Sequence, residues 1–126
     1  MTRNIAYWVS TGLVALLSLF AAFAYLSGSP QAVGGFAHVG YPQQLRVLLG
    51  IAKLLGAITL LVPGLATLKE WAYAGFTFAW ISAFIAHYLA KDGPTAFMPL
   101  VLLLLLAISY LTRPASRRFQ AKVNPV

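Results

Sequence analysis

The chain has 126 residues, of which 60% are hydrophobic and only 9% are charged, against roughly 25% charged residues in a typical soluble domain. This composition excludes an ordinary soluble domain and predicts a single membrane domain over residues 1–126. The net charge of +7 would suggest nucleic acid in a soluble protein, but most basic residues here flank apolar runs, so we expect no nucleic-acid partner. The sequence contains no cysteine, which excludes disulfides, thiol redox relays and thiolate metal ligands.

Four apolar runs are long enough to cross a bilayer, because a hydrocarbon core of about 30 Å needs about 20 residues of helix. We therefore predict an all-α integral membrane protein, a four-helix bundle with spans at about residues 5–26, 42–62, 70–89 and 95–111. A basic tail at 112–126 follows the last span. The first span exceeds the roughly 7–15 apolar residues of a signal peptide, so we interpret it as a membrane anchor.

The segment between the first two predicted spans, residues 27–41, is rich in glycine and contains Pro30. This density of chain-breaking residues predicts a loop, which carries His38. Pro42 then fits the first turn of the second span, where its missing amide hydrogen is not needed.

The second predicted span contains two basic residues within apolar sequence, Arg46 and Lys53. At about 1.5 Å per residue from Pro42, Lys53 lies about 16 Å deep, where a charge costs several kcal/mol unless it is paired or meets water. Glu70 is the nearest carboxylate in sequence, and we predict that it pairs with Lys53 inside the bundle. Two alternatives stay open: Glu70 is a charge at the start of the third span, favoured by the helix dipole, and Arg46 snorkels to the interface.

Small residues recur at every fourth position of the third span and share one helical face: Gly75, Ala79 and Ala83, followed by His87. Such faces let helices approach closely in membranes, so we predict that this one packs against small residues of the second span. Those residues are Gly50, Ala52 and Gly56. The fourth span is dominated by leucine, which favours wide exposure to lipid.

The basic residues are distributed unevenly over the two sides of this four-span arrangement. Lys91 lies alone on one side, and six residues lie on the other: Arg3, Lys69, Arg113, Arg117, Arg118 and Lys122. Because basic residues are enriched in cytoplasmic segments, we predict that both termini are cytoplasmic. His38 and the ends of the spans that carry Arg46 and His87 then face the outside.

Candidate ligand contacts come from aromatic and polar side chains of the second and third spans. Trp71, Tyr73 and Trp80 offer rings for stacking, and Lys53 or His87 can donate hydrogen bonds to carbonyl oxygens. These residues predict a polar interior that suits a lipophilic molecule with oxygen acceptors.

Metal and catalytic sites have weaker support. His38 and His87 with Asp92 fall short of a convincing metal-ligand set, so we predict no metal. No nucleophile with its base, phosphate loop or pair of catalytic carboxylates is recognisable, which leaves open whether the protein is an enzyme.

Several motifs occur in the order and at the spacing of one protein family. They are Tyr41-Pro42, Lys53-Leu54-Leu55-Gly56-Ala57, Leu61-Val62-Pro63, Leu68-Lys69-Glu70-Trp71-Ala72-Tyr73-Ala74-Gly75-Phe76, Ala83 and His87. On these residues the chain resembles the DoxX-like family of small four-span bacterial membrane proteins. The resemblance implies a four-helix bundle in the bacterial cytoplasmic membrane, and family names that go back to a subunit of a quinone-linked sulfur oxidoreductase. It implies no agreed set of catalytic residues.

Three functions from different classes fit these observations. The first is a binding or accessory subunit that holds a lipophilic, quinone-like molecule beside a redox partner protein, without a covalent cofactor. The second is a membrane enzyme acting on a lipid-soluble substrate, with Glu70, Lys53 and His87 as acid and base candidates. The third is a small proton-coupled carrier that uses the same charges as a relay. The first is our leading hypothesis, and a homo-oligomer is an alternative to the redox partner.

Overall fold

The computed structural model describes residues 1–117, and these residues form helices joined by short turns. Arg118 and Lys122, part of the predicted basic tail, lie outside the described residues. The elements are α1 (Thr2–Ser27), α2 (Pro30–His38), α3 (Gln43–Leu61), α4 (Ala66–Leu89), η1 (Gly93–Phe97), α5 (Met98–Leu111) and η2 (Ala115–Arg117). Within the described range there is no strand.

Among residues 1–117, four segments are long and apolar enough to cross a membrane: α1, α3, α4 and the stretch Gly93–Leu111, which comprises η1 and α5. Large apolar side chains are exposed along these helices, among them Leu16, Phe20, Phe78 and Leu104. A soluble protein rarely exposes so much apolar surface, whereas a lipid-facing surface requires it. The prediction of an all-α membrane bundle is confirmed.

The segment that was expected to be a loop contains a helix, so the prediction for residues 27–41 is wrong at 30–38. Ser29 caps α2, because its hydroxyl accepts a hydrogen bond from the Ala32 amide at 3.2 Å, and Pro30 occupies the first turn. In this segment the glycines with left-handed backbone are Gly28 and Gly40, with φ of 70° and 81°, and they lie just outside α2. Glycine therefore marks the ends of α2 correctly, and only the glycines inside it were misleading.

The start of α4 also differs from the prediction. The helix begins at Ala66 rather than 70, after a turn in which Gly64 and Leu65 take positive φ of 75° and 56°. Glu70 therefore lies in the second turn of α4. The last span begins with the 3-10 helix η1. Pro99 in the first turn of α5 has no amide hydrogen to donate to a carbonyl one turn earlier, so the α-helix does not extend toward the N-terminus.

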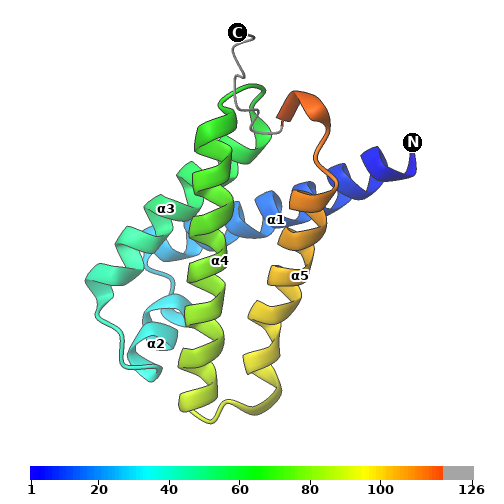
Figure 1. Cartoon of the computed structure of the whole chain (residues 1–126). Coiled ribbons are helices and arrows are strands. Elements are labelled where there is room, and N and C mark those ends of the chain that lie inside the picture. Colours follow the sequence, from blue (N-terminus) through cyan, green and yellow to red (C-terminus); the bar gives the residue numbers. More distant parts are fainter. Residues whose placement is uncertain (118–126) are drawn as a thin grey trace, which may run out of the picture.

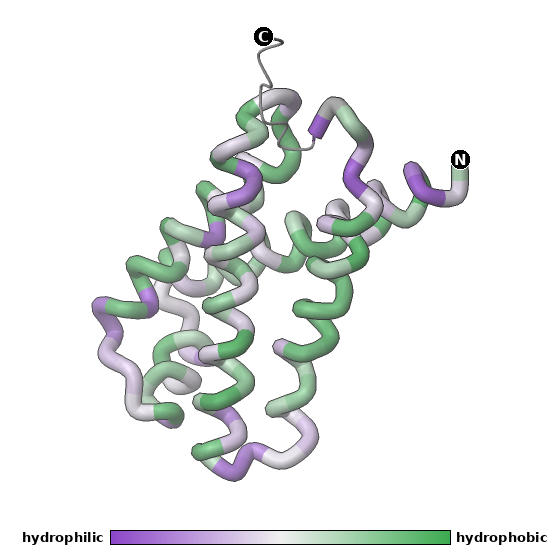
Figure 2. Tube along the Cα trace, in the orientation of Figure 1, coloured by the Kyte–Doolittle hydropathy of each residue, from purple (hydrophilic) through white to green (hydrophobic). Residues whose placement is uncertain are grey.

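Figure 1 shows α3, α4 and α5 side by side, with α1 crossing behind them and the short α2 near one end. The start of α1, the α3–α4 turn and the end of α5 lie at one end of the bundle, and α2 and the α4–η1 turn lie at the other. Hydrophilic residues gather toward these two ends (Figure 2). The buried core between the helices is formed by Val14, Leu60, Tyr73, Phe76, Trp80 and Leu106.

Candidate functional site

Most basic side chains of the described structure bind carbonyl groups at the C-terminal ends of helices. The last carbonyls of a helix have no partner within it, and the helix dipole favours a cation there. Arg46 shows this at α1: its Nη1 donates to the Tyr25 carbonyl, and its Nε donates to Gln43 Oε1 at 2.8 Å. Arg46 is therefore held by the protein rather than extended to the interface.

The end of α3 is capped by two cations from distant parts of the chain. Lys69 is only 1% exposed, and its Nζ donates to the carbonyls of Thr59, at 2.5 Å, and Val62. Arg117 Nη1 donates to the Leu60 carbonyl at 2.9 Å. These charges stabilise the fold and leave α3 with few unpaired carbonyls at this end.

The end of α5 is held in the same way. Arg3 Nη2 donates to the Leu111 carbonyl at 3.2 Å, and Arg113 Nε donates to the Tyr110 carbonyl at 2.7 Å. Arg113 also forms an ion pair with Glu70, whose second carboxylate oxygen accepts a hydrogen bond from the Tyr110 hydroxyl at 3.0 Å. Glu70 thus ties α4 to the end of α5.

The predicted pair between Lys53 and Glu70 is not formed, although both residues are described. Glu70 lies at the end of the bundle where Arg113 supplies a guanidinium, whereas Lys53 lies in the middle of α3. Because Glu70 pairs with Arg113, neither of its two predicted roles, a charge at the helix end or a partner of Lys53, describes it fully.

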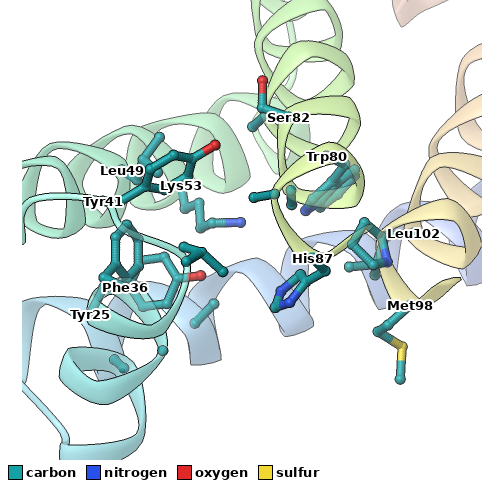
Figure 3. Close-up of a pocket in the computed structure, with 18 of the residues that line it drawn as sticks. Tyr25, Phe36, Tyr41, Leu49, Lys53, Trp80, Ser82, His87, Met98 and Leu102 are labelled. Carbon is teal, nitrogen blue, oxygen red and sulfur yellow. The ribbon is translucent and has the colours of Figure 1, made fainter. Parts of the chain in front are cut away.

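Lys53 extends into a half-open cavity of about 780 Å³ lined by residues of α1, α2, α3, α4, η1 and α5 (Figure 3). Its Nζ lies 5.7 Å from the centroid of the Tyr25 ring and 5.4 Å from that of Trp80, so aromatic faces partly stabilise the charge. Within the described residues Lys53 has no ion pair and no hydrogen bond. It is a partly buried cation whose donors remain available to a ligand.

A second polar group in the cavity wall is also without a partner. Ser18 is only 2% exposed, and its Oγ makes no hydrogen bond in the part of the chain that the structure describes. A buried hydroxyl without a partner costs free energy, and a bound acceptor or donor would remove that cost.

The small-residue face of α4 lines this cavity, so the predicted packing against α3 is wrong. A Cβ atom on Gly75 would meet nothing within 4 Å, and Ala79 and Ala83 are cavity-lining residues. On α3, Gly50 faces Leu26 of α1, and a Cβ on Gly56 would come within 2.9 Å of the Phe76 ring of α4. Because the Phe76 ring fills the contact between α3 and α4, the small residues Gly75, Ala79 and Ala83 of α4 leave open space beside it.

Three titratable groups contact one another at the rim of the cavity, and of these His87 lines it. His38 Nε2 lies 2.5 Å from Asp92 Oδ1, and His87 Nδ1 lies 2.6 Å from Asp92 Oδ2. The hydrogen bonds from His87 and His38 lower the pKa of Asp92, and the one from His87 has the larger effect. Each imidazole faces a different carboxylate oxygen, and no cluster that could hold a metal ion is found within the described residues.

The remaining predicted contacts lie in different environments. Trp80 is buried and lines the cavity, whereas Trp71 is 68% exposed on the outer surface. Tyr73 lies in the core, where its hydroxyl lies 2.7 Å from Ser109 Oγ, which is 2.5 Å from Thr11 Oγ1. The cavity therefore contains three of the predicted site residues: Lys53, Trp80 and His87.

Sequence reasoning missed the contribution of α1 and α2 to the cavity. Tyr25 and Ser18 both lie within the first apolar run, and neither was among the predicted site residues. Phe36 and Tyr41 belong to the segment that was predicted as a loop, and both line the cavity (Figure 3). Ser18 was the one available signal, because a hydroxyl in the middle of a span often faces a helix partner or a ligand.

These features define a small multi-pass helical membrane protein with a half-open, mostly apolar cavity that carries a few polar groups. The sequence model of the DoxX-like family matches residues 9–109, and the chain belongs to this family. The family resemblance expected from the motifs is confirmed. Comparison with curated proteins and with solved structures gives no significant match.

Proposed function

We propose that this protein binds a quinone-like lipophilic molecule in its cavity, within the bacterial cytoplasmic membrane, and presents it to a redox partner protein. The observation that carries the proposal is the combination of the partly buried Lys53 and the buried Ser18, two polar groups without partners in the described structure, in a cavity that is otherwise mostly apolar. Ligand sites commonly have this composition, in which a few polar groups orient a molecule held by apolar contacts.

The size and the aromatic lining of the cavity suit a planar ring. About 780 Å³ falls within the roughly 300–1,000 Å³ of small-molecule sites. Tyr25, Phe36 and Trp80 supply ring faces or edges, and Lys53 Nζ can donate to a carbonyl oxygen. A quinone has a planar ring with two carbonyl acceptors, which matches both features.

A redox partner follows from the chemistry of the lining residues. They can donate hydrogen bonds and exchange protons, but they include no cysteine, and their tyrosine and tryptophan rings do not supply the two electrons that reduce a quinone to a hydroquinone. Electrons that reduce a bound quinone would therefore come from another protein.

The test is quinone binding by the purified protein in lipid nanodiscs. Replacing Trp8 and Trp71 by phenylalanine leaves Trp80 as the single tryptophan, and its fluorescence should be quenched by a short-chain ubiquinone or naphthoquinone. Lys53→Met should weaken binding by about 10- to 100-fold, because a hydrogen bond to a charged group contributes about 1.5–3 kcal/mol. Lys91→Met makes the same chemical change at an exposed position and should leave the affinity unchanged.

Equal affinities for Lys53→Met, Lys91→Met and the parent protein would contradict the proposed site. Turnover of the quinone by the isolated protein would instead favour a membrane enzyme, and uptake into vesicles driven by a pH gradient would favour a carrier.

The cytoplasmic location of both termini belongs to the same proposal. It is supported by the basic residues near the start of α1 and the end of α5, which lie at one end of the bundle. Reporter fusions to the C-terminus should be active only in the cytoplasm, and activity only in the periplasm would reverse the orientation.

A further inference from the structure

We infer that His87 exchanges a proton with a hydroxyl group of the bound ligand, positioned for this by Asp92, so that the cavity takes phenols and hydroquinones as well as quinones. The inference rests on the proposed function, since it concerns the same cavity. It adds an acid–base role and a class of ligand that binding of a carbonyl compound alone does not require.

The geometry at the rim connects the cavity to the surrounding water. His87 is 30% exposed and lines the cavity, Asp92 is 16% exposed, and His38 is 56% exposed. Figure 3 shows the His87 ring directed into the space that the Lys53 side chain also enters. One end of this three-residue cluster therefore meets the ligand, and the other end meets solvent.

The contact with Asp92 determines which nitrogen of His87 is available to a ligand. When Nδ1 carries its proton and donates it to Asp92 Oδ2, Nε2 has a free lone pair and acts as a hydrogen-bond acceptor. A carboxylate that holds an imidazole in this tautomer also stabilises the imidazolium that forms when Nε2 takes a proton. His38 bonds the other carboxylate oxygen and fixes the orientation of Asp92.

The step moves one proton and needs no oxidant. The ligand O–H bond breaks, its electron pair stays on oxygen, and an N–H bond forms at His87 Nε2. The resulting oxyanion faces two cations, the His87 imidazolium and the ammonium group of Lys53, which has no ion pair among the described residues. The reverse transfer returns the proton to the ligand.

Other titratable groups could take the proton and must be compared. From the elements around the cavity these are Tyr25 of α1, Tyr41 before α3, and Lys53 of α3, and Lys91 adjoins Asp92 in the chain. A charged lysine has no acceptor atom, and neither tyrosine hydroxyl contacts a carboxylate among the described residues. His87 lines the cavity with an imidazole whose Nδ1 is held by Asp92, which leaves Nε2 to accept a proton.

The experiment uses a nitrophenol with a short alkyl chain, whose phenolate absorbs visible light, bound to the protein in nanodiscs and titrated with acid and base. The same probe in nanodiscs without the protein gives the spectrum of probe dissolved in the lipid. In the parent protein the bound probe should ionise about one pH unit or more below the probe in this reference, because opposite charges within about 4–6 Å shift ionisation by that amount.

Two variants separate proton exchange from structure. His87→Gln keeps an amide donor toward Asp92 but cannot take a proton, so the downward shift should fall markedly while quinone quenching of Trp80 is retained. His38→Gln keeps a donor toward Asp92 and leaves His87 intact, so the shift should persist. Lys53→Met should reduce both the shift and the quinone affinity.

Quinone binding with an unchanged probe shift in His87→Gln would overturn the inference and leave the proposed function standing. Failure of both quinone and nitrophenol to bind the parent protein would overturn both proposals. Loss of the shift in His87→Gln together with its retention in His38→Gln would support proton exchange at His87.

Discussion

The open space beside Gly75 and the tight contact at Gly56 predict opposite effects for the same substitution on two facing helices. A Cβ on Gly75 would meet no atom within 4 Å, so Gly75→Ala adds a methyl group without a clash. Alanine favours a helix over glycine by about 0.8–1 kcal/mol, and we expect the free energy of unfolding to rise by up to that amount.

At Gly56 the same methyl group would lie 2.9 Å from Cε2 and Cζ of Phe76. The ring has little freedom to move, because it stacks on Trp80 with centroids 5.0 Å apart. Overpacking of this kind costs about 1–3 kcal/mol, which exceeds the gain in helix propensity, so Gly56→Ala should be destabilising by up to about 2 kcal/mol.

Thermal unfolding in a mild detergent, monitored by circular dichroism, measures both variants. For a chain of this size about 1 kcal/mol corresponds to roughly 3–6 °C in Tm, so the two variants should differ by about 5 °C or more. Gly75→Leu should retain stability while abolishing quinone quenching, because the larger side chain extends into the cavity. A Gly75→Ala variant that loses as much stability as Gly56→Ala would show that the face lined by Gly75 is packed against a helix and that the cavity is absent.

Three further predictions concern the polar contacts. Arg113→Met and Glu70→Gln should be non-additive in the free energy of unfolding, by about 1 kcal/mol, whereas Lys53→Met and Glu70→Gln should simply add; chemical denaturation of single and double variants checks this. Lys69→Met should cost about 1.5–3 kcal/mol for each charged hydrogen bond lost at the end of α3, and an unchanged Tm would contradict the cap. The folded protein lowers the pKa of Asp92, so the unfolded state binds more protons in acid. This contribution to stability is therefore present above the ordinary aspartate pKa and is lost as pH falls through the lower folded value. Asp92→Asn should flatten the acid side of the profile of stability against pH, and a profile identical to that of the parent would refute the contact.

Much of the fold could be predicted because the hydropathy pattern of each span extends over about 20 consecutive residues. Each span is a continuous apolar run, and its ends carry proline, glycine or charge, so four crossing helices follow from local pattern alone. α2 was missed because the same glycines that break helices in water are tolerated in a short helix that packs against α1 and α3. Its N-terminal signal, Ser29 followed by Pro30, was present in the sequence.

The candidate site was harder to predict because its partners are distant in the chain. Glu70 was assigned to Lys53, which is close in sequence, but it meets Arg113, which is 43 residues away. Lys53 itself was correctly placed in a span, yet only the three-dimensional structure shows that Tyr25 and Trp80 surround it. Small residues recurring along α4 indicate close approach or open space equally well, and a neighbouring side chain of the same helix, Phe76, which fills the contact with Gly56 of α3, decided between the two.

The caps at the end of α3 have a consequence for how the protein is made. Lys69 and Arg117 were counted as charges that orient the spans, but in the folded protein both are buried and bound to carbonyl groups. Orientation by basic residues acts while the spans enter the membrane, before the helices have assembled. The same two side chains therefore serve biogenesis first, as hydrated charges that resist translocation, and the assembled bundle afterwards. Replacing Lys69 by glutamine, which can still donate to a carbonyl but carries no charge, should separate a defect in membrane insertion from a defect in helix assembly.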